Sequence, residues 1–202
     1  MLIQRHVSAR TALRWVIMAA SAFALALAGP PLPAAYAGGE EAAGVVMAPV
    51  FSAVRPGDRA FFFEVRARDD DAFGHAYMLL EIADARGTIR NAGIFGFGTA
   101  TGAPSGLFSI FGSPGEIGYT GYDLIRPATE TFRVRIDRAT YQRIVQAVGE
   151  KRKTWTVYEL LFFNCNTFIG DIAVQAGLIA PAFDALFPGA YVQRLRELNA
   201  PR

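Results

Sequence analysis

One stretch of this 202-residue chain, from Tyr158 to Gly177, constrains its folding and its chemistry more than any other. From Phe168 onward the apolar residues recur at the spacing of a helix with one buried stripe. The stripe consists of Phe168, Ile169, Ile172, Ala173 and Ala176. Gly177 offers a C-terminal stop, and either Asn164 or Asn166 offers an N-cap. The pattern therefore predicts an amphipathic helix that begins beside Cys165.

Cys165 is the only cysteine in the chain, so no internal disulfide can form. At a helix start, a thiol lies among backbone N–H groups and at the positive end of the helix dipole, which lowers its pKa from about 8.5. The backbone N–H groups of Cys165 and Asn166, with the Asn164 side chain as a further donor, are suited to hold an oxyanion. We therefore predict that Cys165 is a nucleophile. The alternative is a small buried hydrophobe, the more common role of a single cysteine.

The residues from Tyr158 to Phe168 (YELLFFNCNTF) resemble the cysteine block of the PPPDE family, which are permuted papain-fold peptidases. The resemblance is specific over about twenty residues and diffuse elsewhere. It implies an α+β fold, a permuted papain-like (NlpC-like) domain in which a small antiparallel sheet packs against helices and the catalytic cysteine begins a helix. It also implies that a histidine on an earlier strand serves the cysteine, and that no third residue is needed.

His75 is the only histidine after the N-terminal segment, and it follows Gly74 at the start of an apolar stretch. A base that precedes the nucleophile is the chain order that the PPPDE resemblance implies. The Phe73-Gly-His75 segment also resembles the histidine block of the exported DUF4105 family. We therefore predict that His75 is the general base for Cys165 in a reaction through a thioester acyl-enzyme. The alternative is a structural histidine, bonded to its neighbours or exposed at the surface.

A residue that orients His75 is harder to identify from the sequence. If Asp84 to Gly87 form the turn between two paired strands, Gly96 lies opposite His75, and a glycine side chain cannot orient an imidazole. Glu81 and Asn91 are the polar residues that we consider for this role, and they reach His75 only if the strand bends.

Residues 93–121 are rich in glycine and carry several aromatic side chains, among them Phe95, Phe97, Phe108 and Phe111. A long glycine-rich segment within a compact domain is usually a functional loop or a lid. On that interpretation the four phenylalanines line an acyl or peptide groove. Anchors that point into the core are an equally good interpretation.

The N-terminal residues 1–37 have the pattern of a secretory signal peptide. Three arginines precede the apolar run Trp15–Ala28, and Ala35-Tyr-Ala37 offers a cleavage site of small residues. The apolar run is short for a transmembrane helix, which needs about 20 residues. We therefore expect an exported protein, periplasmic or secreted, without a stable membrane span after signal removal. An uncleaved anchor is the alternative.

The remaining chain is long enough for one domain with a hydrophobic core, which we place at residues 55–202 after a flexible linker at 38–54. The elements expected within it are strands at 59–68, 73–83, 88–95 and 131–136, and helices at 137–150, 165–177 and 191–198. Charge is close to balance without the signal, and no basic patch is interleaved with aromatic residues, so nucleic acid is not an expected partner. The sequence predicts neither a metal site nor a cofactor.

These observations lead us to predict a cysteine peptidase or amidase that acts on a peptide, protein-amide or acyl substrate. Two alternatives stay open: an acyltransferase or lipase-like thiol enzyme on the same fold, and a catalytically silent binding domain. The acyl alternative requires an open apolar slot that leads to Cys165. The silent domain requires an inert, buried thiol.

Overall fold

The computed structural model describes residues 53–69, 73–182 and 187–201. These residues belong to one compact unit that comprises Gly39–Arg202. The predictions for the signal at 1–37, and for most of the linker at 38–54, lie outside the described residues. Within the described ranges, we find no helix with the length and hydropathy needed to cross a bilayer.

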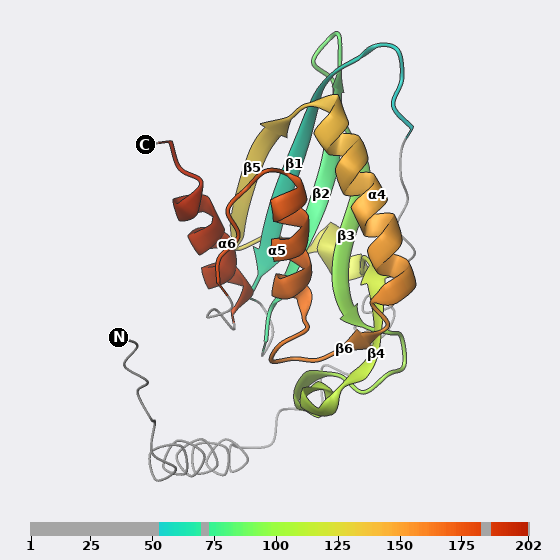
Figure 1. Ribbon diagram of the computed structural model, residues 1–202, viewed down its shortest axis with the longest axis vertical. Coiled ribbons are helices and arrows are strands. Elements are labelled where there is room, and N and C mark those ends of the chain that lie inside the picture. The colour runs from blue at the N-terminus through green and yellow to red at the C-terminus, as the bar shows by residue number, and fades with distance from the viewer. Residues whose placement is uncertain (1–52, 70–72, 183–186, 202) are drawn as a thin grey trace, which may run out of the picture. The chain divides into compact units, whose positions relative to one another are not determined.

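The core of the fold is a six-stranded antiparallel sheet with the strand order β5-β1-β2-β3-β4-β6 (Figure 1). Its strands are β1 (Asp58–Arg68), β2 (His75–Asp84), β3 (Ile89–Thr99), β4 (Ser113–Gly118), β5 (Glu130–Ile136) and β6 (Val157–Tyr158). Three longer helices lie over one face of this sheet: α4 (Arg138–Thr154), α5 (Cys165–Gln175) and α6 (Pro188–Leu198). The predicted α+β class, with an antiparallel sheet packed against helices, is confirmed.

Strand β2 is buried on both faces, which explains its almost continuous apolar sequence. Ala76, Met78, Leu80 and Ile82 belong to the main core, with residues of α4, α5 and α6. Tyr77 and Leu79 point to the other face and pack with Ile94 in a smaller cluster. His75 begins this strand, so the packing on both faces fixes the backbone that carries its imidazole.

Helix α5 has the predicted buried stripe, since Phe168, Ile169, Ile172 and Ala173 are fully buried. Asn164 is its N-cap, because the side-chain Oδ1 accepts hydrogen bonds from the backbone N–H groups of Asn166 at 2.9 Å and Thr167 at 3.2 Å. This settles the choice between Asn164 and Asn166. The buried stripe fixes how α5 is rotated about its own axis, and the N-cap fixes its first turn. Cys165, the first residue of α5, is therefore held next to β2.

The glycine-rich segment is not a long loop. β3 extends through it to Thr99, and a short 3₁₀ helix, η2 (Gly106–Phe111), and β4 follow. A short helix that the sequence analysis missed, α3 (Gly121–Ile125), comes directly afterwards.

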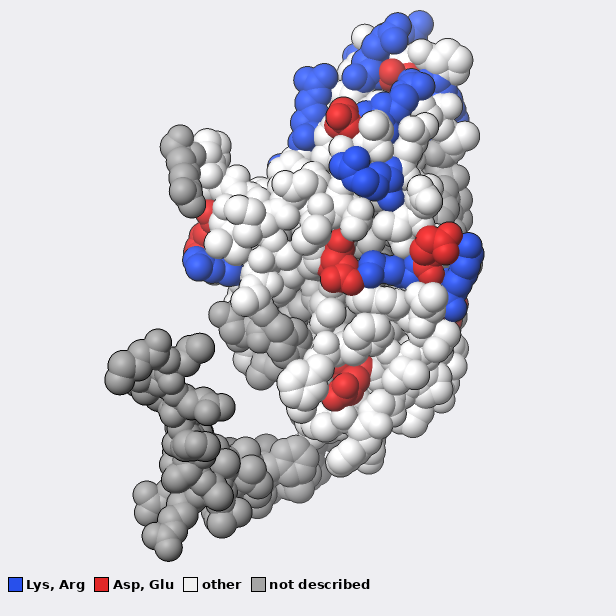
Figure 2. Space-filling view, viewed as in Figure 1, with Lys and Arg blue, Asp and Glu red and all other residues white. Residues whose placement is uncertain are grey.

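Charged side chains are unevenly distributed over the face that carries α4, α5 and α6 (Figure 2). Lys and Arg gather at the end of the fold where β2 finishes, at the top of the view. The opposite end, near η2, is almost without charge, because residues 91–115 contain no Asp, Glu, Lys or Arg.

Candidate active site

The two residues predicted to form a catalytic pair, His75 and Cys165, lie in contact. The start of β2 and the start of α5 meet, and the His75 imidazole lies beside the Cys165 thiol, close enough for each group to shift the pKa of the other. The backbone N–H groups of Ala76 and Asn166 lie near the sulfur and help to lower its pKa, although the Asn166 N–H donates to the Asn164 Oδ1 at 2.9 Å. Donors near a thiol favour its thiolate form.

The pKa values of this pair shift in opposite directions. Burial alone would raise the pKa of the Cys165 thiol, but the hydrogen bond and charge of His75, helped by the two N–H groups, lower it below its ordinary value. Burial alone would lower the pKa of the His75 imidazole, but the negative charge of Asp123 and the contact with Cys165 raise it. Both shifts favour the form in which the proton sits on His75 and the sulfur is a thiolate.

Two glycines shape the surroundings of His75: Gly74 fixes the backbone before it, and Gly96 leaves the space for its imidazole. Gly74, with φ +65°, lies directly before His75, and a Cβ at this position would meet the Arg68 carbonyl oxygen at 2.6 Å. A Cβ on Gly96 would lie 2.5 Å from the His75 Nε2 and 3.0 Å from its Cε1. On its remaining side the ring stacks on Tyr77, with centroids 6.1 Å apart and planes at 9°. The ring is therefore confined to one position by backbone on one side and an aromatic ring on another.

The predicted position of Gly96 was wrong in register. We expected Gly96 opposite His75, but Gly96 pairs with Tyr77 on β2. The turn closes between Asp84 and Thr88, through the Asp84 N–H and the Thr88 carbonyl at 3.1 Å, and a bulge between Leu80 and Glu81 shifts the pairing further. A bulge adds one residue to one strand and leaves no clear trace in the sequence.

Asp123, on α3, supplies the charge that the sequence analysis did not find. Its carboxylate is fully buried and bonds to the Thr120 backbone N–H through Oδ2 at 2.7 Å and to the Arg68 Nε through Oδ1 at 3.3 Å. Among the charges that act on His75, it contributes most to the raised pKa. The spacing of Thr120 and Asp123 is that of a capping box, a sequence signal for a helix start that could have pointed to this residue.

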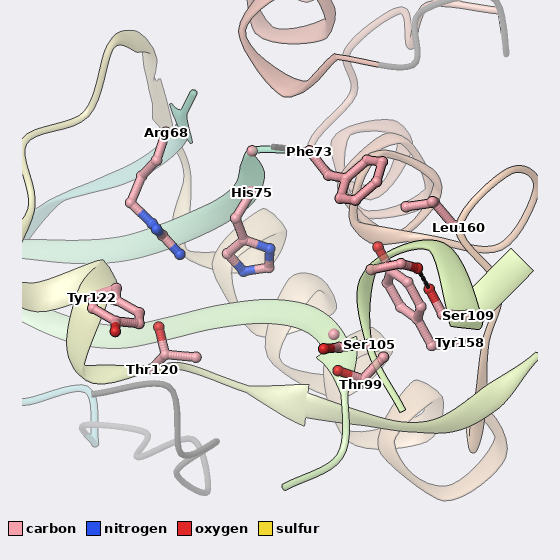
Figure 3. A pocket seen from close by; sticks show the side chains of 13 residues that line it. Arg68, Phe73, His75, Thr99, Ser105, Ser109, Thr120, Tyr122, Tyr158 and Leu160 are labelled. Atoms are coloured by element: carbon pink, nitrogen blue, oxygen red, sulfur yellow. Dashed lines mark hydrogen bonds between the residues drawn. The ribbon is translucent and has the colours of Figure 1, made fainter. Parts of the chain in front are cut away.

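A pocket of about 490 Å³ opens beside His75 (Figure 3). Arg68 and Tyr122 lie on one side of the imidazole in this view, and Phe73 and Leu160 lie on the other. Hydroxyl side chains, including Ser109 and Tyr158, complete its wall. The pocket therefore has Arg68 and Tyr122 on one side, and a mixture of hydroxyl and apolar side chains on the side of the segment that precedes α5.

The sulfur itself is well covered. Cys165 is 5% exposed and belongs to the hydrophobic core, and His75 rather than Cys165 lines the pocket. The Asn166 side chain also approaches the thiol, with its Oδ1 at 4.0 Å from the sulfur. No acceptor for the Cys165 backbone N–H is found among the described residues, so this group stays available at the helix start.

The Asn164 side-chain oxygen caps α5, and its Nδ2 donates one of its two N–H groups to the Leu160 carbonyl at 2.7 Å, so its role as a further oxyanion donor stays a prediction. The two residues that we considered for orienting His75 do not reach it. Glu81 lies six residues along β2 from His75, which is about 20 Å in a strand. Asn91 pairs opposite Glu81 in the sheet, and neither reaches the imidazole. The strand does not bend enough to bring them together.

The predicted phenylalanine groove is also absent from the described part of the chain. Phe95 and Phe97 are fully buried in the main core, because β3 continues through the glycine-rich segment and points both rings toward the helices. Phe108 and Phe111 project from η2 and are 76% and 92% exposed. None of the four lines the pocket.

Within the described residues, no group of three or more His, Cys, Asp or Glu side chains is arranged to hold a metal ion. What the site does contain is a thiol, an imidazole and a buried carboxylate, supplied by α5, β2 and α3. Comparisons with protein-family models, with curated proteins and with solved structures found no match to this chain.

Proposed function

We propose that the protein is an exported cysteine hydrolase of the permuted papain-like type, which cleaves amide bonds with Cys165 as nucleophile and His75 as general base. The observation that carries this proposal is that His75 lies beside Cys165 at the start of α5, where their pKa values shift in opposite directions. A cysteine with a purely structural role in a core has no need of a basic partner.

The reaction begins with the thiolate of Cys165, whose proton His75 holds. The sulfur attacks the amide carbon, and the carbonyl oxygen becomes an oxyanion that the Cys165 backbone N–H stabilises. The His75 imidazolium then donates its proton to the leaving amine, and a thioester forms on Cys165. Water, deprotonated by His75, attacks the thioester, and the acid product leaves as the thiol is restored.

Asp123 acts on this cycle through the charge of His75. A buried carboxylate stabilises the imidazolium, and the imidazolium in turn stabilises the thiolate. We therefore assign Asp123 as a positioning residue, since no contact between it and the reacting atoms is needed.

Peptides and protein amides suit the hydroxyl-lined pocket beside His75, because its side chains offer both donors and acceptors. The acyltransferase or lipase-like alternative loses its main support, because the four phenylalanines form no slot that leads to Cys165. The silent-domain alternative rests on the low exposure of the sulfur, and it predicts an inert thiol.

An activated ester tests the proposed nucleophile without knowledge of the natural substrate. With p-nitrophenyl acetate, we expect a burst of nitrophenolate and the gain of one acetyl group on Cys165 by mass spectrometry. The acyl-enzyme should then hydrolyse. His75→Ala should slow acylation by about 100-fold or more, the usual worth of a general base.

Cys165→Ala serves as the control for this experiment, because it removes the sulfur and keeps a small apolar side chain. We expect it to show neither the burst nor the acetylated peptide. A nitrophenolate burst of the same size and rate in Cys165→Ala would overturn the proposal.

A further inference from the structure

The end of the fold where β2 finishes carries five exposed arginines from separate parts of the chain. Arg55 precedes β1 and Arg59 lies at its start, Arg86 comes from the turn after β2, Arg135 from β5, and Arg138 from the first turn of α4. The pairing of β1 with β2 and β5 brings these segments together. We call this surface the arginine end; it lies within the blue area at the top of Figure 2.

These five arginines have no carboxylate within ion-pair distance among the described residues. Other exposed basic side chains do have partners: Lys153 pairs with Glu150 at 2.9 Å, and Arg194 pairs with Glu197 at 3.0 Å. The positive charge of the arginine end is therefore less neutralised than that of these other basic side chains.

The aspartates at this end are engaged in holding the backbone. Asp58 accepts from the Arg55 backbone N–H at 2.6 Å and pairs with Arg90 at 2.8 Å. Asp84 accepts from the N–H groups of the following turn, and Asp137 caps α4. Because these oxygens accept from those donors, the three aspartates hold the local backbone and, in the described part of the chain, form no ion pair with the five arginines.

The chain also enters the fold at this end. The carbonyl of Ala53, the first described residue, accepts a hydrogen bond from the Arg90 Nη2 at 3.0 Å. The residues before it include the apolar run Trp15–Ala28, the part of the sequence with the strongest affinity for a membrane. That run would bring the chain to a membrane, and the chain that follows it enters the described fold at the arginine end.

We propose that the arginine end docks on the surface of an anionic lipid bilayer. Guanidinium groups bind phosphate oxygens, and basic residues close to an anionic surface each add to the attraction. The hollow at this end, about 480 Å³ and lined by Arg59, Arg135 and Arg138, also contains the carboxylates of Asp58 and Asp137. Those two charges disfavour a single small anion, whereas a surface of many headgroups contacts the outer arginines separately.

Docking in this way directs the candidate active site away from the bilayer. His75 begins β2 and Asp84 ends it, so the two ends of the strand are about 30 Å apart. The pocket beside His75 would then face the aqueous compartment. This inference does not rest on the proposed function.

Vesicle binding tests the proposal on the protein as it is recovered from cells that export it, with its N-terminus sequenced. Binding to phosphatidylcholine vesicles, with and without phosphatidylglycerol, is measured by co-sedimentation at about 0.05 M and about 0.5 M salt. We expect binding that requires phosphatidylglycerol and falls at high salt. The variant R59Q/R135Q/R138Q should bind anionic vesicles roughly tenfold or more weakly.

A matched control variant, R152Q/K153Q/R194Q, removes the same number of positive charges from exposed positions elsewhere and should keep most of the binding. Equal losses in both variants would mean that overall charge, not the arginine end, drives binding, and would overturn the proposal. Two further results would overturn the proposal. One is equal binding to neutral and anionic vesicles by a protein that begins near Gly38. The other is complete release from anionic vesicles by soluble polyphosphate at equal phosphate concentration.

If the N-terminal run is retained and binds every vesicle, hydrogen exchange on the bound protein replaces sedimentation. We then expect the turn at 84–88 to be protected on anionic vesicles relative to neutral ones, and R59Q/R135Q/R138Q to lose that protection. Equal exchange of this turn on both kinds of vesicle would overturn the proposal.

Discussion

At the scale of single residues, the state of His75 depends on three neighbours. Gly96 leaves the space in which the ring lies, Asp123 favours its charged form, and Cys165 shares its proton. Each neighbour controls a different property: position, charge and reactivity. Substitutions at Gly96 and Asp123 can therefore separate the position of the imidazole from its charge.

Gly96→Ala should displace the imidazole, because the new Cβ would lie 2.5 Å from Nε2. We expect acylation of Cys165 by p-nitrophenyl acetate to fall by roughly tenfold or more, as small misplacements of a catalytic group do. Gly98→Ala is the matched control on the same strand, since a Cβ there meets no atom within 4 Å. Equal rates in the two variants would show that the ring does not depend on the space at Gly96.

Asp123→Asn should lower the pKa of His75, because the negative charge that stabilises the imidazolium is removed. A weaker imidazolium stabilises the thiolate less, so the pKa of Cys165 should rise and its alkylation near pH 6 should slow by roughly threefold or more. The titration of the His75 ring by NMR measures the first effect directly.

Asp137→Asn is the control for that change, because it neutralises another aspartate at a helix start, at the far end of the fold. It should destabilise α4 and leave the His75 titration unaltered. If Asp137→Asn moved the His75 pKa as far as Asp123→Asn does, the effect would belong to net charge and not to Asp123.

At the scale of elements, the first turn of α5 positions Cys165 in the candidate active site. Asn164→Ala removes the N-cap and should lower the free energy of unfolding by about 1 kcal/mol, measured by denaturant titration. Asn164→Asp keeps an acceptor for the cap, so it should lose less stability. Its carboxylate would lie next to Cys165, however, and should raise the pKa of the thiol. A thiol pKa that is the same in both variants would mean that the helix start does not influence the sulfur.

Helix α5 and strand β2 could be predicted from the sequence because their signals are local. The buried stripe of α5 repeats at helical spacing, and the cap residue directly precedes it. The contact of His75 with Cys165 was predicted from a family resemblance and from chain order. In the structure it forms because the start of β2 packs against the start of α5.

The remaining parts of the site depend on contacts between distant segments. Asp123 lies on a five-residue helix that has no hydrophobic period to reveal it, and only the fold brings it close to His75. The glycine-rich segment was expected to be a loop, because glycine has a low strand propensity. In the structure the later residues of β3 are a strand because they pair with β4, a contact that the local sequence does not reveal. The bulge at Leu80 likewise could not be predicted.

At the scale of the whole molecule, the two ends of the sheet differ in their surfaces. The arginine end lies at one end of the sheet, and the candidate active site lies at the other, beside the uncharged residues near η2. Phe108, Phe111 and Phe162 are exposed in that region. The fold therefore separates an electrostatic surface from the end of the molecule at which chemistry is proposed.

The most direct test of the central claim is the pH dependence of Cys165 alkylation by iodoacetamide in the folded protein. If His75 and the start of α5 activate the thiol, labelling should reach half its maximal rate well below pH 8.5, because the rate follows the thiolate fraction. His75→Ala should move the profile upward toward that of an ordinary thiol, with the fold intact by circular dichroism. A Cys165 that is labelled only after denaturation, or a profile that His75→Ala leaves unchanged, would contradict the account.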